Sequence, residues 1–108
     1  MVLPHTRPLS ESIRFDLQRD PEFRRALLAE ILGTMLTGDV DTGMSVMRHY
    51  INGTMGFMKL GSALGKSPKH LIRILGPAGN PNLRTFFEIV AYLQKVDRTI
   101  LTVQGIAA

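Results

Sequence analysis

The chain has 108 residues, of which 44% are hydrophobic and 20% are charged, and it contains no cysteine. This composition is typical of one globular domain with a modest core, and it excludes a disordered chain, a disulfide framework and a thiolate metal site. No apolar run approaches the roughly 20 residues of a membrane span, and no secretory signal opens the chain, so we expect a cytoplasmic protein that does not enter a membrane.

The charge is distributed unevenly along the chain. Residues 1–53 contain six Lys and Arg against seven Asp and Glu, whereas residues 54–108 contain seven against two, so the two halves carry −1 and +5. The segment from Thr42 to Phe87 has no acidic residue at all. Its basic side chains are Arg48, Lys59, Lys66, Lys69, Arg73 and Arg84, together with His49 and His70. Such a field favours a polyanionic partner, of which nucleic-acid phosphates are the commonest.

The first part of the chain predicts a mobile N-terminal arm, residues 1–9, followed by a helical scaffold, residues 10–53. Ser10 is the expected cap of a short helix that ends near Arg19. Asp20 and Pro21 then start a second helix toward Leu36, because aspartate accepts hydrogen bonds from free amides and proline fits the first helical position. Its expected buried side chains are Phe23, Leu27, Ile31 and Met35, and its expected solvated ones are Glu22, Arg24, Arg25 and Glu30.

A third helix is expected after Gly38, from about residue 39 or 41 to the pair Asn52 and Gly53. Both closing residues tolerate the left-handed conformation that helix ends often need. The side chains expected to face inward are Val40, Met44, Met47 and Ile51. The methionines Met44, Met47, Met55 and Met58 are interpreted as core residues.

Residues 54–96 predict two short helices, a loop and a long apolar helix. The short helices cover about residues 56–64 and 68–75, with a tight turn at Gly65 and Ser67 as the cap of the second. The loop of residues 76–81 precedes a helix over residues 83–95, for which Asn82 is the expected cap. The apolar side chains expected to form the core here are Phe86, Phe87, Val90 and Leu93.

The tail, residues 97–108, has a different pattern. Thr99, Leu101 and Val103 alternate with their neighbours at a period of two, which is typical of a strand. A single strand needs a partner for its amides and carbonyls, and a second copy of the chain would supply one across a twofold axis. The tail therefore leaves room for a short dimerisation strand and a homodimer.

The two short helices match the pattern of a helix-turn-helix, in which the helices touch closely at a tight turn. Gly61 falls where they must touch. Leu60, Leu64, Leu71 and Ile74 are placed to pack inward. On the second helix, residues set 100° apart leave Lys69 and Arg73 opposite the buried side, so these two cations would face the major groove of double-stranded DNA.

Several side chains then become candidate DNA contacts. Lys69 and Arg73 can donate to guanine or bind phosphate, and Ile72 could meet a thymine methyl. His70 flanks them, either at the helix boundary or against DNA. The residues better suited to phosphate are Lys59, Asn80, Asn82 and Arg84, at the starts of the first short helix and of the long apolar helix.

Other chemistries find little support in the residues. His5, His49 and His70 do not form a metal-ligand pair at helical spacing. The loop of residues 76–81 lacks the ending of a phosphate-binding loop, and no nucleophile with a base suggests catalysis. We therefore expect neither an enzyme nor a bound cofactor or metal.

Three segments together resemble the prophage and addiction-module antidote proteins, a group of lambda-repressor-like, Cro-type helix-turn-helix regulators. They are Asp-Pro-Glu-Phe at residues 20–23, the sequence FMKLGSALGKSPKHLIRIL at residues 57–75, and Gly-Asn-Pro-Asn-Leu-Arg-Thr-Phe at residues 79–86. The resemblance implies an all-α, lambda-repressor-like bundle of five to six helices, an operator-binding dimer, and in some members neutralisation of a toxin encoded beside them.

By that resemblance Ser67, Lys69 and Arg73 belong to the recognition helix, and residues 80–84 belong to the phosphate side. The chain departs from the usual pattern at Gly61, Lys66 and Pro68, which affects the expected docking angle.

The first hypothesis is a DNA-binding transcriptional regulator that represses its own gene and resembles an antitoxin. The alternative is a helical protein-interaction module that binds a partner such as a toxin without significant DNA binding.

Overall fold

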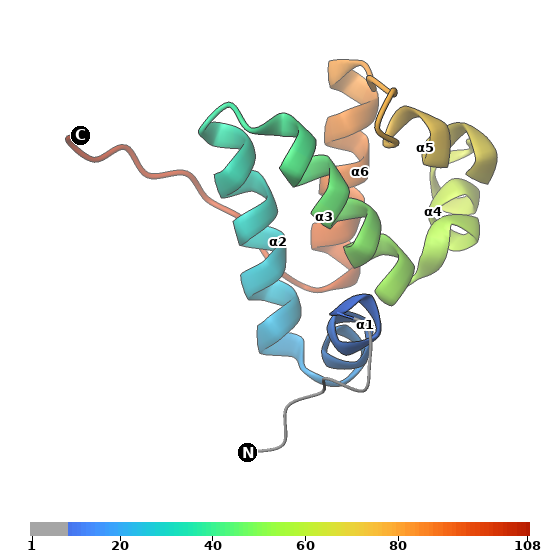
Figure 1. The fold of residues 1–108 in the computed structure, drawn as a ribbon, viewed down its shortest axis with the longest axis horizontal. Helices are drawn as coiled ribbons and strands as arrows, with labels where there is room; N and C mark the ends of the chain where they lie inside the picture. Colours follow the sequence, from blue (N-terminus) through green and yellow to red (C-terminus); the bar gives the residue numbers. More distant parts are fainter. Residues whose placement is uncertain (1–8) are drawn as a thin grey trace.

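The computed structural model describes residues 9–108, which form six α-helices (Figure 1). They are α1 (Leu9–Arg19), α2 (Pro21–Leu36), α3 (Val40–Gly53), α4 (Gly56–Leu64), α5 (Pro68–Ile74) and α6 (Leu83–Val96). No strand occurs in this described part of the chain, so the predicted all-α class is confirmed. The predicted arm lies outside the described residues except for Leu9, which begins α1 one residue before the expected cap Ser10.

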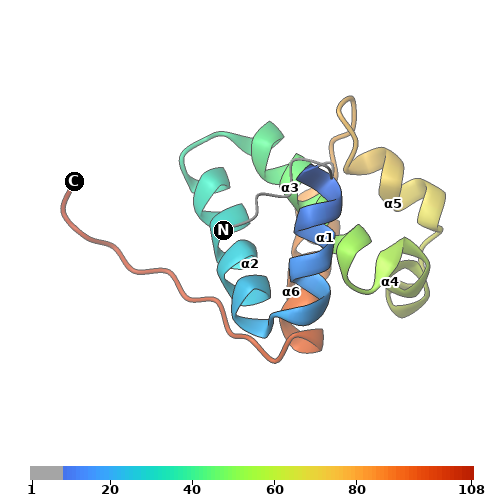
Figure 2. The same cartoon turned by 60° about the horizontal axis from the view of Figure 1, so that its bottom comes forward.

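The helix with the most extensive contacts is α3, which packs against α1, α2 and α4. The α6 helix runs behind α3 and between two helical pairs (Figure 1). The α2 and α3 helices form the most extensively packed pair, and α1 lies across one end of it (Figures 1 and 2). The α4 and α5 helices form the second pair on the other side of α6. The predicted scaffold and the predicted DNA-binding pair therefore contact each other directly through α3 and α4, and α6 also contacts α4.

All six helices contribute to a single buried cluster. Its members are Leu17, Leu28, Ile31, Met47, Tyr50, Ile51, Phe57, Leu60, Leu71, Leu75, Ile89, Val90 and Leu93. Burial of an aliphatic side chain stabilises a fold by about 1.5–3 kcal/mol, so this cluster fixes the positions of the helices relative to one another.

Three residues expected in the core lie at the surface instead. Val40 and Phe87 are about half exposed, and Met58 is 79% exposed. On α6 the buried arc is centred between Ile89, Val90 and Leu93, and the 100° step per residue turns Phe87 away from it. The prediction also left out three residues that are fully buried, which are Leu28 on α2, Tyr50 on α3 and Ile89 on α6.

The expectation that Arg24 is solvated is wrong. Its Nε lies 2.7 Å from Asp97 Oδ1, and its Nη1 donates to the Leu17 carbonyl oxygen at 2.8 Å. The guanidinium therefore joins α2 to α1 and to the residue that follows α6. Sequence periodicity could not show this contact because Asp97 lies 73 positions further along the chain.

Helix ends follow the predicted capping residues in most places. Asp20 Oδ1 accepts hydrogen bonds from the amides of Glu22 and Phe23 at 3.0 and 3.2 Å, and Gly38 ends α2 with a φ of +95°. Gly53 differs from the expectation, because it stays helical and is buried. A Cβ atom there would lie 2.7 Å from Leu17 Cδ1, so this glycine lets α1 approach α3.

The tail does not form the strand that its alternation suggested, since no residue in the described 97–108 segment is a strand. The Gln94 backbone carbonyl accepts a hydrogen bond from the Thr99 amide at 2.9 Å, and Gln94 Oε1 accepts one from the Leu101 amide at 2.8 Å. The Leu101 side chain packs against the core. Beyond it the tail extends away from the helices past α2 (Figures 1 and 2).

Candidate nucleic-acid interface

The turn between α4 and α5 is held by a close contact at Gly61. A Cβ atom on this residue would lie 2.5 Å from the Lys66 carbonyl oxygen and 3.3 Å from Pro68 Cδ, so no larger residue fits without a shift of the backbone. Gly65 ends α4 in the left-handed conformation with a φ of +66°, and the Lys66 amide donates to the Gly61 carbonyl at 2.9 Å. The predicted point of contact between the two helices is therefore present.

The start of α5 has the expected cap. Ser67 Oγ accepts a hydrogen bond from the His70 amide at 3.1 Å, and Pro68 occupies the first turn. This geometry assigns the Ser67 hydroxyl to the helix terminus, where it satisfies an otherwise free amide.

The end of α5 is fixed by two residues that the sequence did not single out for this task. Arg48 on α3 donates from Nη1 to the carbonyl oxygen of Leu75, directly after α5. Gly79 lies so close that a Cβ atom there would be 2.2 Å from the Arg73 carbonyl oxygen and 2.4 Å from that of Ile74. The sequence pointed to Gly79 only as part of the Gly-Asn-Pro element, without this role, and nothing local in the sequence signalled Arg48.

The outward face of α5 carries four of the predicted contacts. Leu71 is buried and Ile74 is half-buried, while Lys69, His70, Ile72 and Arg73 are exposed. Arg73 Nη2 lies 2.8 Å from His70 Nδ1. Because a guanidinium has five N–H donors, Arg73 keeps most of them free while His70 orients it.

No carboxylate neutralises this face. The only ion pair within residues 9–108 joins Arg24 to Asp97, so Lys69 and Arg73 have none. Of the other cations in the acid-free segment, Lys59 and Arg84 are exposed, Lys66 is half-buried, and Arg48 is used inside the fold. The segment is thus divided into cations that hold the structure and cations that face solvent.

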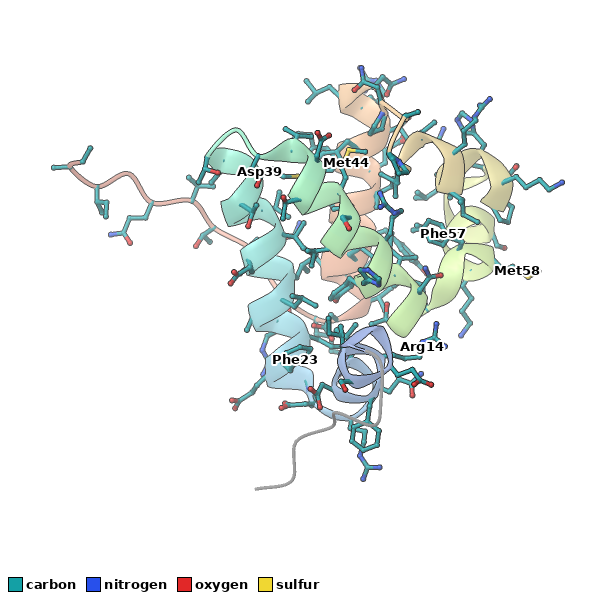
Figure 3. The ribbon with its side chains drawn as sticks, in the orientation of Figure 1. Arg14, Phe23, Asp39, Met44, Phe57 and Met58 are labelled. Carbon is teal, nitrogen blue, oxygen red and sulfur yellow. The ribbon has the colours of Figure 1, made fainter. Side chains whose placement is uncertain are left out.

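Lys59 does not lie with the predicted phosphate contacts at the start of α6. It borders a cavity together with Val96 and Asp97, at the far end of that helix. A helix of 14 residues is about 20 Å long, so Lys59 and Arg84 stand at opposite ends of α6. The neighbouring residues Phe57 and Met58 show the orientation of α4, since the first points inward and the second away from the body (Figure 3).

At the start of α6, Asn82 Oδ1 accepts a hydrogen bond from the Thr85 amide at 2.8 Å and so caps the helix. Asn80 and Arg84 are exposed on either side of it. The same surface also exposes Leu83 and Phe87. The surface predicted to bind phosphate therefore carries both polar and apolar side chains.

Other kinds of site receive no geometric support in the described part of the chain. Within residues 9–108 no three His, Asp or Glu side chains are grouped as metal ligands would be. None of the helices described there combines the length and apolar character needed to cross a membrane.

Comparison with protein-family models, with curated proteins and with solved structures gave no match. The resemblance to antidote proteins thus remains an interpretation of residues 20–96.

Proposed function

We propose that the protein is a DNA-binding transcriptional regulator in which α4 and α5 act as a helix-turn-helix and α5 enters the major groove. The observation that supports this most directly is the outward face of α5, where Lys69 and Arg73 stand one helical turn apart without any carboxylate partner. A major groove about 12 Å wide admits one α-helix, and its guanine O6 and N7 atoms accept hydrogen bonds from both residue types.

The positioning of α5 adds to this argument. Gly61 allows α4 to touch the turn, Arg48 holds the carbonyl after α5, and Gly79 packs against the helix end. A recognition element has to be held rigidly, because loosely placed donors lose much of their discrimination between bases. The proposed biological role is repression of the protein's own gene within a prophage or toxin–antitoxin module, as the resemblance implies.

The test is binding to duplex DNA from directly upstream of the gene, against a scrambled duplex of equal length. Lys69→Ala and Arg73→Ala should each weaken binding to the native duplex by about 1–3 kcal/mol where a base is read. A phosphate contact would instead weaken both duplexes alike and lower the salt slope by about one. Fluorescence anisotropy over a salt series measures both quantities.

The matched controls are Lys95→Ala and Arg25→Ala, which remove the same charges from exposed positions on α6 and α2. If binding depended on net charge alone, each control would weaken it as much as its partner on α5, and the recognition-helix assignment would be wrong.

The alternative is a protein-interaction module that binds a partner such as a toxin without significant DNA binding. The exposed apolar residues Leu83 and Phe87 on α6 favour this reading. Salt-independent and negligible binding to both duplexes, together with co-purification of the neighbouring gene's product, would support it over the regulator.

A further inference from the structure

An apolar groove of about 330 Å³ opens between the α2–α3 turn and the first turns of α6. Met35, Val40 and Met44 line one side, and Leu83, Phe86 and Phe87 line the other. Figure 3 shows Met44 on the part of α3 that faces the start of α6. Within this lining Leu83 and the half-exposed Val40 and Phe87 leave apolar surface open to solvent.

This groove does not suit DNA, because apart from Asn80 its lining has apolar side chains where phosphates need donors. An exposed apolar surface of this kind marks a site for another protein segment. The chain itself contains a segment of matching chemistry. Residues 99–108 have no charged side chain, and they leave Ile100, Val103 and Ile106 at least 81% exposed.

The tail is fixed at one end and unpartnered at the other. Gln94 holds the Leu101 amide, and Leu101 packs against the core. Beyond that anchor the tail leaves the body of its own chain (Figure 2). We propose that the groove receives the apolar tail of a second copy, with Val103 and Ile106 as the side chains that enter it.

Reciprocal exchange would fill both grooves of a pair and leave neither tail exposed. Such an arrangement closes on itself as a twofold dimer and does not extend into a filament. It also differs from pairing of two tails as strands, because the contact surface is then the groove on α2, α3 and α6. The arrangement is independent of whether α5 binds DNA.

The absence of native cysteine allows a direct test by cross-linking. A protein with Ile106→Cys is mixed with a separate protein with Phe87→Cys and oxidised gently, since a disulfide forms only where the Cα atoms come within about 7 Å. The expected product is a covalent dimer of the two species, at several times the yield obtained when Met58→Cys replaces Phe87→Cys. Met58 is the matched control because it is equally apolar and more exposed, but lies on α4 away from the groove.

Three outcomes would overturn the proposal. Equal yield from Ile106→Cys alone would indicate tail-to-tail pairing. A chain carrying both substitutions that cross-links only within itself would show that the tail fills its own groove. Equal yields with Phe87→Cys and Met58→Cys would show random collision.

Sedimentation of the full chain without DNA gives a second measurement. Leu83→Asp in the groove and Ile106→Asp in the tail should each raise the dimer dissociation constant at least about tenfold, because each places a charge in an apolar contact. Met58→Asp should leave it unchanged. A chain that is monomeric throughout, or a dimer weakened by Leu83→Asp but not by Ile106→Asp, would contradict the proposal. In the latter case the groove would serve another partner surface.

Discussion

Two arginines of the scaffold helices α1–α3 and two cations on α5 have opposite roles. In the scaffold, Arg24 is paired with Asp97 and Arg48 donates to the Leu75 carbonyl, so both guanidinium groups hold elements together. On α5, Lys69 and Arg73 have no carboxylate partner and face solvent. The difference shows that the contacts of each cation have to be known before the charge of a basic segment is assigned to a ligand.

The two regions also use glycine differently. A Cβ atom on Gly61 or Gly79 would first meet backbone oxygens of the α4–α5 region, whereas on Gly43 or Gly53 in the scaffold it would first meet side chains, those of Met35 and Leu17, which can move more easily than backbone. The α4–α5 region is therefore the more sensitive of the two to added volume.

The largest expected effect comes from Gly79→Ala. The new methyl group would meet the carbonyl oxygens of Arg73 and Ile74 at 2.2 and 2.4 Å, so the loop or the end of α5 must move. We expect a loss of about 3 kcal/mol in the free energy of unfolding, at the upper end of the usual effect of overpacking. Urea denaturation followed by circular dichroism measures it.

The matched control is Gly33→Ala, which should raise the free energy of unfolding by about 0.5–1 kcal/mol because alanine favours the helix and no clash results. Equal effects of the two substitutions would contradict the close approach at the end of α5.

The next prediction separates the two arginine roles directly. Arg48→Ala should lower the free energy of unfolding by about 2 kcal/mol, because the buried Leu75 carbonyl loses a charged donor. Arg73→Ala should change stability little, since its guanidinium lies at the surface. Binding to the upstream duplex should reverse this order, with Arg73→Ala the weaker binder under conditions where both variants are folded.

The contrast between the two arginines would be refuted if the Arg48→Ala and Arg73→Ala variants behaved alike. If both variants lost stability equally, Arg73 would be a structural residue. If both retained stability and lost DNA binding, Arg48 would contact DNA and the hydrogen bond to Leu75 would not explain its placement.

Much of this fold could be predicted because local signals agree with one another. Asp20, Ser67 and Asn82 each begin the expected helix, since a side-chain acceptor before a helix satisfies free amides whatever the tertiary structure. Gly61 and Gly65 marked the turn for equally local reasons.

The errors arise where a contact joins distant parts of the chain. Arg24 looked solvated because Asp97, its partner, is not adjacent in sequence. The tail looked like a strand because its alternation is real, but the hydrogen bonds that Gln94 accepts from the Thr99 and Leu101 amides depend on where α6 ends. Phe87 was placed in the core by its hydrophobicity, which cannot distinguish a buried position from the rim of a groove.

The candidate site was predictable to a similar extent. Lys69 and Arg73 share an exposed face, as helical spacing requires. Lys59 on α4 lies near the last residues of α6, whereas Arg84 lies at the start of that helix. Charged residues can be counted from a sequence, but the distance between two charges on different helices depends on how those helices pack. Arg48 shows the converse, since an apparent member of the basic segment proved to be an internal support of α5.

The smallest expected effect concerns the scaffold alone. Burial, and after it the Asp97 carboxylate, raises the pKa of Tyr50 from 10.0 to about 12, while Arg24 opposes the shift. Because the folded state holds the phenol proton more tightly, this contribution to stability is complete below pH 10 and is lost as the pH rises toward 12. The loss should be about 1 kcal/mol, since Tyr50 lines a cavity that opens to solvent. Urea denaturation at pH values between 9 and 12 would measure it, and Tyr50→Phe should remove the fall while Tyr92→Phe keeps it. An identical fall in wild type and Tyr50→Phe would contradict the assignment of the alkaline sensitivity to Tyr50.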